Sequence, residues 1–467
     1  MTNAIKRSKG AAALILLSAV LAAPLAPLAQ EIVVGRSAGT DSSANSSNAA
    51  SESASSRSNA GGADRSPAGS AERLGFSPER LERIAQLMQR QIEANLFPGA
   101  VTLIVRDDEI AYFHAQGLMD VATRRPMERD AVFRIMSMTK PVVAVSILMM
   151  VEEGKVRLTD PVSRFIPELE ALTVVAPDEQ DTAASASSTT ARVSRTVPAD
   201  REITIRDLLT HTAGFMTTDG PSSARGVAIG AGDSLADLMP RLAEVPLDFQ
   251  PGTRWAYSGQ FAFDVLARIV EIASGMPFGD FAQQRIFDPL GMTDTFFHLP
   301  AEGHPRLATL YRTADGELEP MAEMPFVNGA YFSGGGGLFS TAEDYLKFAR
   351  MLANGGALGE ARLLGRKTVD LMRSALVPDT LPGRTAGEGY GLGVRVVTDP
   401  AARNTLVSTG TFGWSGAFNT HFFIDPVERI IGIFMTQSAF LESRWQLRDD
   451  FETAVMQALV DGAGSGD

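Results

Sequence analysis

The sequence predicts an α+β protein in which strands from both ends of the chain form one sheet and a mostly helical half is inserted between them. Strand-like apolar runs lie near both ends, at residues 101–105, 111–116, 390–397, 405–408, 417–424 and 429–436. Apolar residues recur at helical spacing through the middle, at residues 205–211, 234–242, 260–274, 278–287 and 342–353. With 467 residues, 45% of them hydrophobic, the chain can bury one large core in this way.

The first ordered element is a predicted helix that begins after Ser77. Ser77 can accept a hydrogen bond from the first turn, and Pro78 suits the first helical position. An apolar stripe follows at helical spacing, formed by Leu81, Ile84, Leu87, Met88 and Ile92. The next two strands are short and separated by residues 107–109, which predicts a hairpin.

The remaining organisation follows from composition and spacing. A last helix is predicted at residues 443–459, after the final strand. Residues 177–200 are rich in Ala, Ser, Thr and Asp and interrupt the helical middle. Because long structureless loops are uncommon inside compact domains, we interpret this segment as a surface insertion in a single domain that spans residues 73–467.

Residues 1–29 have the pattern of a signal peptide. Lys6, Arg7 and Lys9 precede an apolar run that is short for a membrane span and contains Pro24. We expect cleavage near Ala29, an exported protein that is periplasmic or secreted, and no stable membrane span afterwards. Residues 30–72 are dominated by Ser, Ala, Asn and Gly, which predicts a disordered linker because few apolar residues are available to offset the entropy of ordering.

The composition excludes several classes of function. The formal net charge is −13, which argues against a nucleic-acid partner. The absence of cysteine removes disulfides and thiolate metal sites, and the 5 histidines include no pair at the helical metal-binding spacing. We therefore expect no metal and no cofactor.

A candidate nucleophile lies at the start of a helix that is apolar on nearly every side. Ser137 and Lys140 are three residues apart and share a helix face, and Pro141 requires the helix to begin close to Ser137. Unpaired N–H groups at a helix start favour an anion, and burial would favour the uncharged amine of Lys140 as a base. The alternative interpretation is an ordinary helix start with a capping serine and an extended lysine.

Several ordered segments carry a resemblance to a known family: residues 133–141, 203–215, 257–259, 287–295, 334–344 and 413–426. Over roughly residues 73–460 the chain resembles the serine β-lactamase and penicillin-binding-protein superfamily. Within it, the chain looks most like the class C β-lactamases and their esterase relatives, the family VIII carboxylesterases. The resemblance implies a β-lactamase/transpeptidase-like fold, with an antiparallel sheet flanked by helices, and an acyl-enzyme formed on Ser137.

The resemblance also implies roles for other residues. Tyr257 takes the place of the tyrosine that relays protons between nucleophile and lysine, although a core tyrosine beside Trp255 is the alternative. Its motif ends in Gly259 where β-lactamases have the asparagine that holds a substrate amide. The backbone N–H groups of Ser137 and Ala417 would form the oxyanion hole.

The third family motif, a lysine-containing strand, corresponds to Trp414, Ser415 and Gly416. The lysine that grips a lactam carboxylate has thus become an indole, which suits an uncharged acyl or alkoxy group better. We predict that Trp414, Ser415, Gly416 and Gly259 bind substrate.

Four other features are weaker candidates. Ser415 lies in a sequence close to the Gly-x-Ser-x-Gly nucleophile motif, but the last glycine is one place early. His211 is expected to make a structural hydrogen bond rather than to join a triad, and strand alternation is expected to point His421 to solvent. The glycine run at residues 334–337 is interpreted as a loop that borders the pocket.

The predicted function is a serine hydrolase, most of all a carboxylesterase on short or medium acyl esters, because Trp414 and Gly259 both depart from the β-lactamase pattern. The alternatives are a β-lactamase, a D-amino-acid peptidase or amidase, or an acyltransferase, each acting on a small-molecule ester or amide. A non-catalytic penicillin-binding-like receptor is the alternative from another class.

Overall fold

The computed structural model describes residues 69–176, 195–223, 226–230, 232–300, 303–322, 329–439 and 443–460. The signal peptide predicted at residues 1–29 lies outside these residues, as do most of the predicted linker and residues 177–194 of the predicted insertion. The last linker residues are described, and they form helix α1 (Ser70–Arg73). In the described part of the chain, no helix is both long and apolar enough to span a bilayer.

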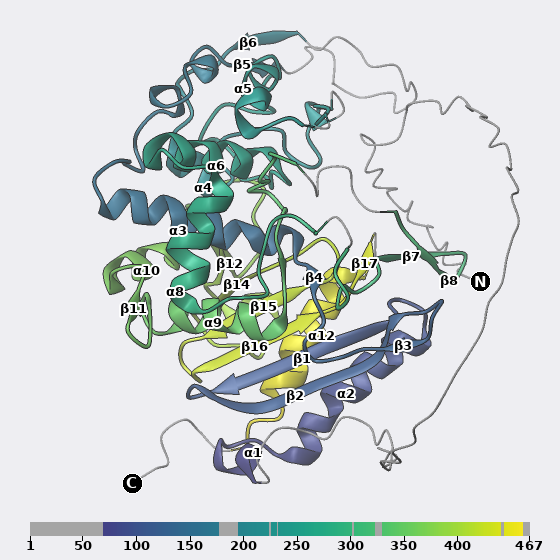
Figure 1. Cartoon of the computed structure of the whole chain (residues 1–467). Helices are drawn as coiled ribbons and strands as arrows, with labels where there is room; N and C mark the ends of the chain where they lie inside the picture. The colour runs from purple at the N-terminus through teal and green to yellow at the C-terminus, as the bar shows by residue number, and fades with distance from the viewer. Residues whose placement is uncertain are drawn as a thin grey trace, which may run out of the picture. The chain divides into compact units, whose positions relative to one another are not determined.

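One antiparallel sheet of eight strands joins the two ends of the domain (Figure 1). Its order is β12 (Glu388–Tyr390), β13 (Arg395–Val397), β14 (Phe412–Ser415), β15 (His421–Asp425), β16 (Ile430–Met435), β1 (Gly99–Arg106), β2 (Glu109–Asp120) and β3 (Arg125–Pro126). β1 pairs with β16, and Leu103 lies opposite Ile433. The predicted sheet of distant segments, with its α+β class, is therefore confirmed.

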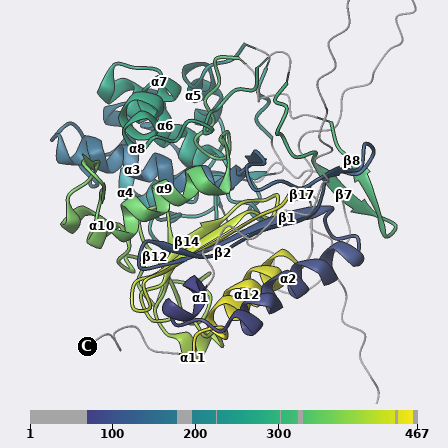
Figure 2. The ribbon, with the colours of Figure 1, turned by 60° about the horizontal axis from the view of Figure 1, so that its bottom comes forward.

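Helices cover both faces of the sheet, as Figure 2 shows. α2 (Pro78–Glu93) and α12 (Arg444–Met456) pack together on one face, while α9 (Ala342–Ala353) packs on the other below the helical half. All eight residues of β1 are buried because neither face meets solvent. The sheet thus has a core on each side.

The start of the domain follows its sequence signals closely. The Ser77 hydroxyl accepts from the backbone N–H of Arg80, and α2 begins at Pro78. The hairpin between β1 and β2 turns at Asp107 and Asp108, with φ of 52° and 61°. Acidic residues tolerate this left-handed conformation better than most side chains.

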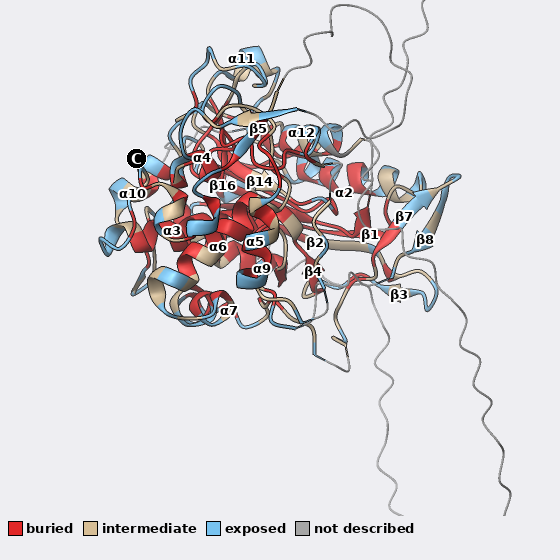
Figure 3. Ribbon diagram, turned by 90° about the horizontal axis from the view of Figure 1, so that it is seen from above, coloured by how far each residue is buried: buried red, intermediate tan, exposed pale blue. Residues whose placement is uncertain are grey.

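The helical half is built around α3 (Thr139–Glu152), which is buried from Thr139 to Met150. α6 (Phe261–Ser274) packs against it, and Figure 3 shows the buried interior in red. α4 (Ile205–Leu209) and α5 (Leu235–Ala243) each start with a capping box, which satisfies N–H groups that a helix start leaves free.

Several predicted elements differ in detail. Residues 390–397 are split between β12 and β13 by a turn. Residues 405–408 form no strand and bend at positions 406 and 407, with Leu406 56% exposed. The strand predicted at 417–424 starts only at His421, because residues 416–420 turn and the N–H of Gly416 bonds to the carbonyl of Thr420. The helix predicted at 278–287 comprises α7 (Phe278–Ala282) and a π-helical turn (Gln283–Phe287), and continues as α8 (Asp288–Leu290).

Short elements complete the domain. β4 (Phe133–Arg134) pairs with β9 (Phe339–Ser340) and so places the segment before Ser137 beside the glycine-rich turn. β5 (Thr173–Val175) pairs with β6 (Thr196–Pro198) at the two ends of the predicted insertion. The others are β7 (Tyr311–Ala314), β8 (Glu317–Pro320), β10 (Ala357–Leu358), β11 (Ala361–Arg362), β17 (Ser438–Ala439), α10 (Arg366–Met372), α11 (Pro400–Arg403), and the 3₁₀ turns Met136–Met138, Val162–Arg164 and Pro167–Leu169.

Candidate active site

Ser137 lies in the 3₁₀ turn that leads into α3. The helix begins at Thr139, so Pro141 falls in its first turn, where its missing N–H costs no helical hydrogen bond. Met136, the residue before Ser137, has a φ of 48°, a conformation that costs energy for a side chain of this kind. The Tyr345 hydroxyl holds the turn by donating to the carbonyl of Met138 at 2.9 Å. The 3₁₀ turn at Met136–Met138, which carries the predicted nucleophile, is therefore held in a tight conformation by Tyr345.

Lys140 is fully buried beside Ser137. Its Nζ lies 3.1 Å from Ser137 Oγ and donates to the carbonyls of Gly259 at 2.6 Å and Gly335 at 2.7 Å. Two N–H groups of the Lys140 amine can donate to these two carbonyls. The third tetrahedral position of the amine nitrogen then faces Ser137 Oγ. In its neutral form Lys140 would present a lone pair there and could accept the hydroxyl proton.

Tyr257 completes the group around the nucleophile. Its hydroxyl donates to Ser137 Oγ at 2.7 Å, and Lys140 Nζ lies 5.1 Å from the centre of its ring. The Tyr257 backbone is fixed by the N–H of Thr218, which donates to its carbonyl at 2.8 Å. The structure thus brings together the three residues that the sequence analysis selected, although 120 positions separate Ser137 from Tyr257.

Asp264 belongs to this group although the sequence analysis missed it. It is a fully buried residue of α6 and accepts hydrogen bonds from Tyr331 Oη, Ser333 Oγ at 3.0 Å and the Gly335 N–H at 2.9 Å. Burial raises the pKa of Asp264, while these donors and the charge of Lys140 oppose the rise. The available signal was an acidic residue within the apolar pattern of residues 260–274.

The end of β14 forms the opposite wall of the site. The Trp414 ring lies 5.5 Å from that of Tyr257 and 5.3 Å from that of Tyr390, centre to centre. A Cβ on Gly416 would lie 2.3 Å from the carbonyl oxygen of Ile135, so only glycine lets the strand pass this close to the nucleophile turn. Ala417 follows directly. Its N–H as part of an oxyanion hole stays a prediction.

Gly259 serves the site through its backbone. Its carbonyl binds Lys140, and a Cβ at this position would meet only Thr218 Oγ1, at 3.4 Å. Space for a side chain therefore exists where the resemblance places an asparagine in β-lactamases.

His211 makes a structural hydrogen bond, in agreement with the sequence analysis. Its Nδ1 accepts from the N–H of Ser258 at 3.2 Å, and its ring lies 4.8 Å from that of Tyr257. Burial, and then the charge of Lys140, hold the pKa of His211 well below its ordinary value. His211 is therefore neutral, its Nδ1 is engaged by the Ser258 N–H, and its ring packs against that of Tyr257.

The expectation that His421 points to solvent is wrong. His421 is 1% exposed, its Nδ1 lies 2.9 Å from Ser415 Oγ, and its Nε2 lies 3.2 Å from Glu452 Oε1. Strand alternation predicts a solvent-facing side chain only where one sheet face is open, and here α12 covers that face. Burial lowers the pKa of His421 to about 4.

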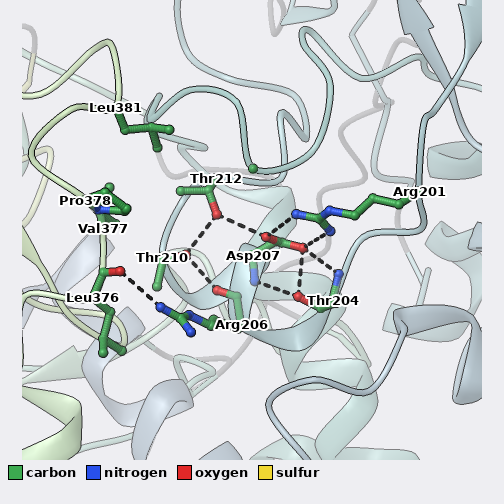
Figure 4. Close-up of a pocket in the computed structure, with 11 residues that line it drawn as sticks. Arg201, Thr204, Arg206, Asp207, Thr210, Thr212, Leu376, Val377, Pro378 and Leu381 are labelled. Carbon is green, nitrogen blue, oxygen red and sulfur yellow. Dashed lines mark hydrogen bonds and ion pairs between the residues drawn. The ribbon is translucent and has the colours of Figure 1, made fainter.

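A cavity of about 350 Å³ lies beside the segment that carries His211, but it contains none of the predicted site residues (Figure 4). Arg201 Nη1 pairs with Asp207 Oδ2 at 2.6 Å, and Asp207 also caps α4 through Thr204. Arg206 donates to the carbonyl of Leu376 at 3.0 Å. The polar groups of this cavity are engaged with one another, so it supports the fold.

In the described ranges, no three His, Asp or Glu side chains come together in a group that could hold a metal ion.

A serine in contact with a lysine one turn away and with a tyrosine from the helical half, beside an antiparallel sheet, is the arrangement expected of a serine hydrolase. The family model of the β-lactamases matches residues 84–456, and the chain belongs to this family.

Three similar proteins illustrate the range of the family. An uncharacterised protein of Mycobacterium tuberculosis is 36% identical over 361 residues, covering 74% of this chain and 87% of its own. Esterase EstB of Burkholderia gladioli is 32% identical over 388 residues, covering 77% and 90%. The solved structure of EstCE1, described as a hydrolase with promiscuous acyltransferase activity, superposes with a TM-score of 0.66 at 28% identity, covering 81% and 99%. The esterase and the hydrolase among these relatives imply a small-molecule substrate.

Proposed function

We propose that the protein is a carboxylesterase that transfers the acyl group of short or medium esters to Ser137 and then to water. The observation that carries this proposal is the position of Ser137 Oγ, 3.1 Å from Lys140 Nζ and 2.7 Å from Tyr257 Oη. A hydroxyl in hydrogen-bond contact with two proton-handling groups can be activated as a nucleophile.

In the first half-reaction Ser137 Oγ bonds to the acyl carbon and the bond to the alcohol oxygen breaks. The proton of Ser137 passes to the Lys140 and Tyr257 pair and then to the departing alcohol. In the second half-reaction the pair takes a proton from water, the hydroxide bonds to the acyl carbon, and the proton returns to Ser137 Oγ as the acid leaves. The two backbone N–H groups predicted for the oxyanion hole would stabilise the negative oxygen in both steps.

The aromatic wall, which Trp414, Tyr257 and Tyr390 form together, supports esters over carboxylate-bearing lactams as substrates. Trp414 stands where the β-lactamase motif has a lysine, and its ring packs against Tyr257 and Tyr390. An indole provides no cation for a carboxylate but a large apolar surface for an acyl chain. The 32% identity to esterase EstB, which extends over 90% of that protein's length, supports the same choice.

Burst kinetics with p-nitrophenyl butyrate test the proposal. We expect one equivalent of nitrophenol per enzyme in the burst and a labelled Ser137 after fluorophosphonate treatment. Ser137→Ala should lose both. Ser146→Ala is the matched control, because Ser146 lies on the same helix and its hydroxyl bonds only within it, to the Val142 carbonyl at 2.9 Å. Equal activity of the wild type and Ser137→Ala, or nitrocefin turnover that rivals ester turnover, would overturn the proposal.

Acyl transfer to an alcohol is a second candidate, which the similarity to EstCE1 supports. The acyl-enzyme would then react with an alcohol in place of water, within the same aromatic wall. Adding butanol to the ester assay should produce butyl butyrate if this route operates, and only butyric acid if it does not.

Export also remains a proposal that rests on residues 1–29. Recovery of a shortened chain that starts near residue 30 from the periplasm or medium would support it, and a full-length chain confined to the cytoplasm would contradict it.

A further inference from the structure

One residue, His211, holds Tyr257 from both sides along the chain. The N–H of Ala256 donates to the carbonyl of His211 at 3.1 Å, and the N–H of Ser258 donates to His211 Nδ1 at 3.2 Å. These two donors flank Tyr257 in the sequence. The edge-on contact between the His211 and Tyr257 rings, 4.8 Å between centres, adds a third restraint. Both the backbone and the ring of Tyr257 are thus located by His211.

His211 is itself fixed in a conformation that histidine seldom adopts. Its φ is 56°, in the left-handed region, which costs energy for a residue with a side chain. The Thr210 and Thr212 hydroxyls on either side of it lie 3.0 Å apart, and Thr212 Oγ1 donates to Asp207 Oδ1 of α4 at 3.2 Å (Figure 4). Such a conformation persists only where the surroundings enforce it. Here the carbonyl and the ring of His211 both reach the segment 256–258.

The ring of His211 is not placed to move protons. Since Nδ1 accepts from the Ser258 N–H, it carries a lone pair that is already engaged. Burial and the charge of Lys140 keep the pKa of His211 well below its ordinary value, so the ring is neutral at neutral pH and its hydrogen lies on Nε2. Neither nitrogen can then accept a proton from Ser137 or from a substrate. Any effect of His211 on the reaction must pass through the groups that it holds.

Tyr257 depends on this support because its ring is only partly buried. Its hydroxyl, at the far end of the side chain, donates to Ser137 Oγ at 2.7 Å, so a small rotation of the backbone would displace it. A displacement of about 1 Å at a reacting group can cost about a hundredfold in rate. The hydrogen bond to Ser137 therefore requires the segment 256–258 to stay in place.

We propose that His211 is a positioning residue for the hydrolysis: through its carbonyl, its Nδ1 and its ring, it keeps the Tyr257 hydroxyl against Ser137 Oγ. This rests on the proposed esterase function for the reaction that His211 serves. The placement of Tyr257 does not depend on the substrate. We therefore expect substitutions of His211 to lower kcat and to leave KM nearly unchanged.

Two substitutions of His211 in the full chain test the role of its Nδ1 in the hydrolysis of p-nitrophenyl butyrate. His211→Ala removes the ring and the acceptor, and should lower kcat by about ten- to hundredfold. His211→Asn places a carbonyl oxygen where Nδ1 lies and tolerates the left-handed φ. It should recover about three- to tenfold of the loss, the effect of one neutral hydrogen bond. Equal losses of kcat in the two variants would overturn the role of Nδ1.

His304→Ala is the matched control for the loss of a histidine. His304 Nδ1 also accepts a backbone N–H, from Arg306 at 3.3 Å, but its ring packs against Phe296 and not against Tyr257. We expect its kcat to equal that of the wild type. If His304→Ala lowers kcat as much as His211→Ala does, the effect of His211 is not specific to Tyr257 and the proposal fails.

A double-mutant cycle separates positioning from general support of the fold. If His211 acts through the Tyr257 hydroxyl, adding His211→Ala to Tyr257→Phe should change kcat by less than about threefold, because the group that it positions is already gone. The same loss of kcat in both backgrounds would mean that His211 only supports the fold. Should His211→Ala not fold, His211→Gln takes its place in the cycle, since its oxygen lies one atom beyond the position of Nδ1.

The rate at which a fluorophosphonate labels Ser137, measured on the same variants, needs no ester hydrolysis. We expect this rate to fall in His211→Ala but not when His211→Ala is added to Tyr257→Phe. If the wild type hydrolyses the butyrate and His211→Ala keeps its kcat and its labelling rate, this inference fails while the esterase stands. If the wild type hydrolyses no ester, the proposed function fails, and the labelling rates alone decide the role of His211.

Discussion

Asp264 and Lys140 are joined through the backbone of a single residue, Gly335. The N–H of Gly335 donates to Asp264 Oδ1 at 2.9 Å, and the carbonyl of the same residue accepts from Lys140 Nζ at 2.7 Å. Asp264 therefore helps to hold Lys140, the predicted base, without touching Ser137. Burial raises the pKa of Asp264, and the charge of the nearby Lys140 opposes that rise.

Replacing Asp264 should test this positioning role. Asp264→Asn keeps an oxygen for the Gly335 N–H, whereas Asp264→Ala removes it. We expect Asp264→Ala to lower kcat by about ten- to hundredfold with little change in KM, because the base is misplaced.

Asp264→Asn should retain more kcat than Asp264→Ala, because its carboxamide oxygen can still accept from the Gly335 N–H. Measuring kcat, KM and the melting temperature of both variants checks this. An unchanged kcat in Asp264→Ala, or equal losses of kcat in the two variants, would show that Asp264 does not act through Gly335.

Tyr257→Phe should reduce kcat/KM by about 10²- to 10⁴-fold, the usual contribution of a positioned proton donor or acceptor. The ring contacts with Trp414 and His211 are kept, so the melting temperature should change little. Ester kinetics and thermal unfolding measured on the same preparation check both parts. A loss below threefold would remove Tyr257 from the mechanism.

Trp414→Lys should change the preferred substrate by restoring the cation of the family motif. We expect kcat/KM for the p-nitrophenyl monoester of glutarate, relative to that for p-nitrophenyl pentanoate, to rise by about tenfold. The reason is that a lysine ammonium pairs with the free carboxylate of the glutarate and an indole does not. Trp414→Phe is the control that removes the indole without adding charge. The same rise in both variants would mean that space, and not charge, governs the selectivity.

Stability should fall as the solution is acidified from about pH 6.5 to pH 4. His421 has its pKa lowered from 6.5 to about 4 by burial, so above pH 6.5 neither the folded nor the unfolded state protonates it. Between these values the unfolded state binds a proton that the folded state refuses, which costs up to about 3 kcal/mol.

Urea unfolding at pH 7.5, 5.5 and 4.5 measures this loss. His421→Gln is the comparison, because glutamine can still bond to Ser415 and Glu452 but does not titrate in this range. We expect a flatter dependence of the unfolding free energy on pH in the variant. Parallel curves for the two proteins would assign the acid sensitivity to other groups, such as the buried His211.

The sequence by itself determined the features that depend on neighbours along the chain. Ser137 and Lys140 meet because three residues of a helix bring side chains to one face, and the start of α2 follows from Ser77 and Pro78. The α+β class also followed from the positions of strand and helix patterns. In each case the interaction that decides the structure spans only a few residues.

The tertiary structure decided what depends on distant segments. Asp264 reaches Lys140 only because a turn at residues 331–335 folds over α6, and His421 is buried only because α12 covers its face of the sheet. The periodicity of a single strand cannot reveal which face another helix will cover. The group of Ser137, Lys140 and Tyr257 was thus predicted from the sequence, while the contacts of Asp264 and His421 became visible only when distant side chains met in space.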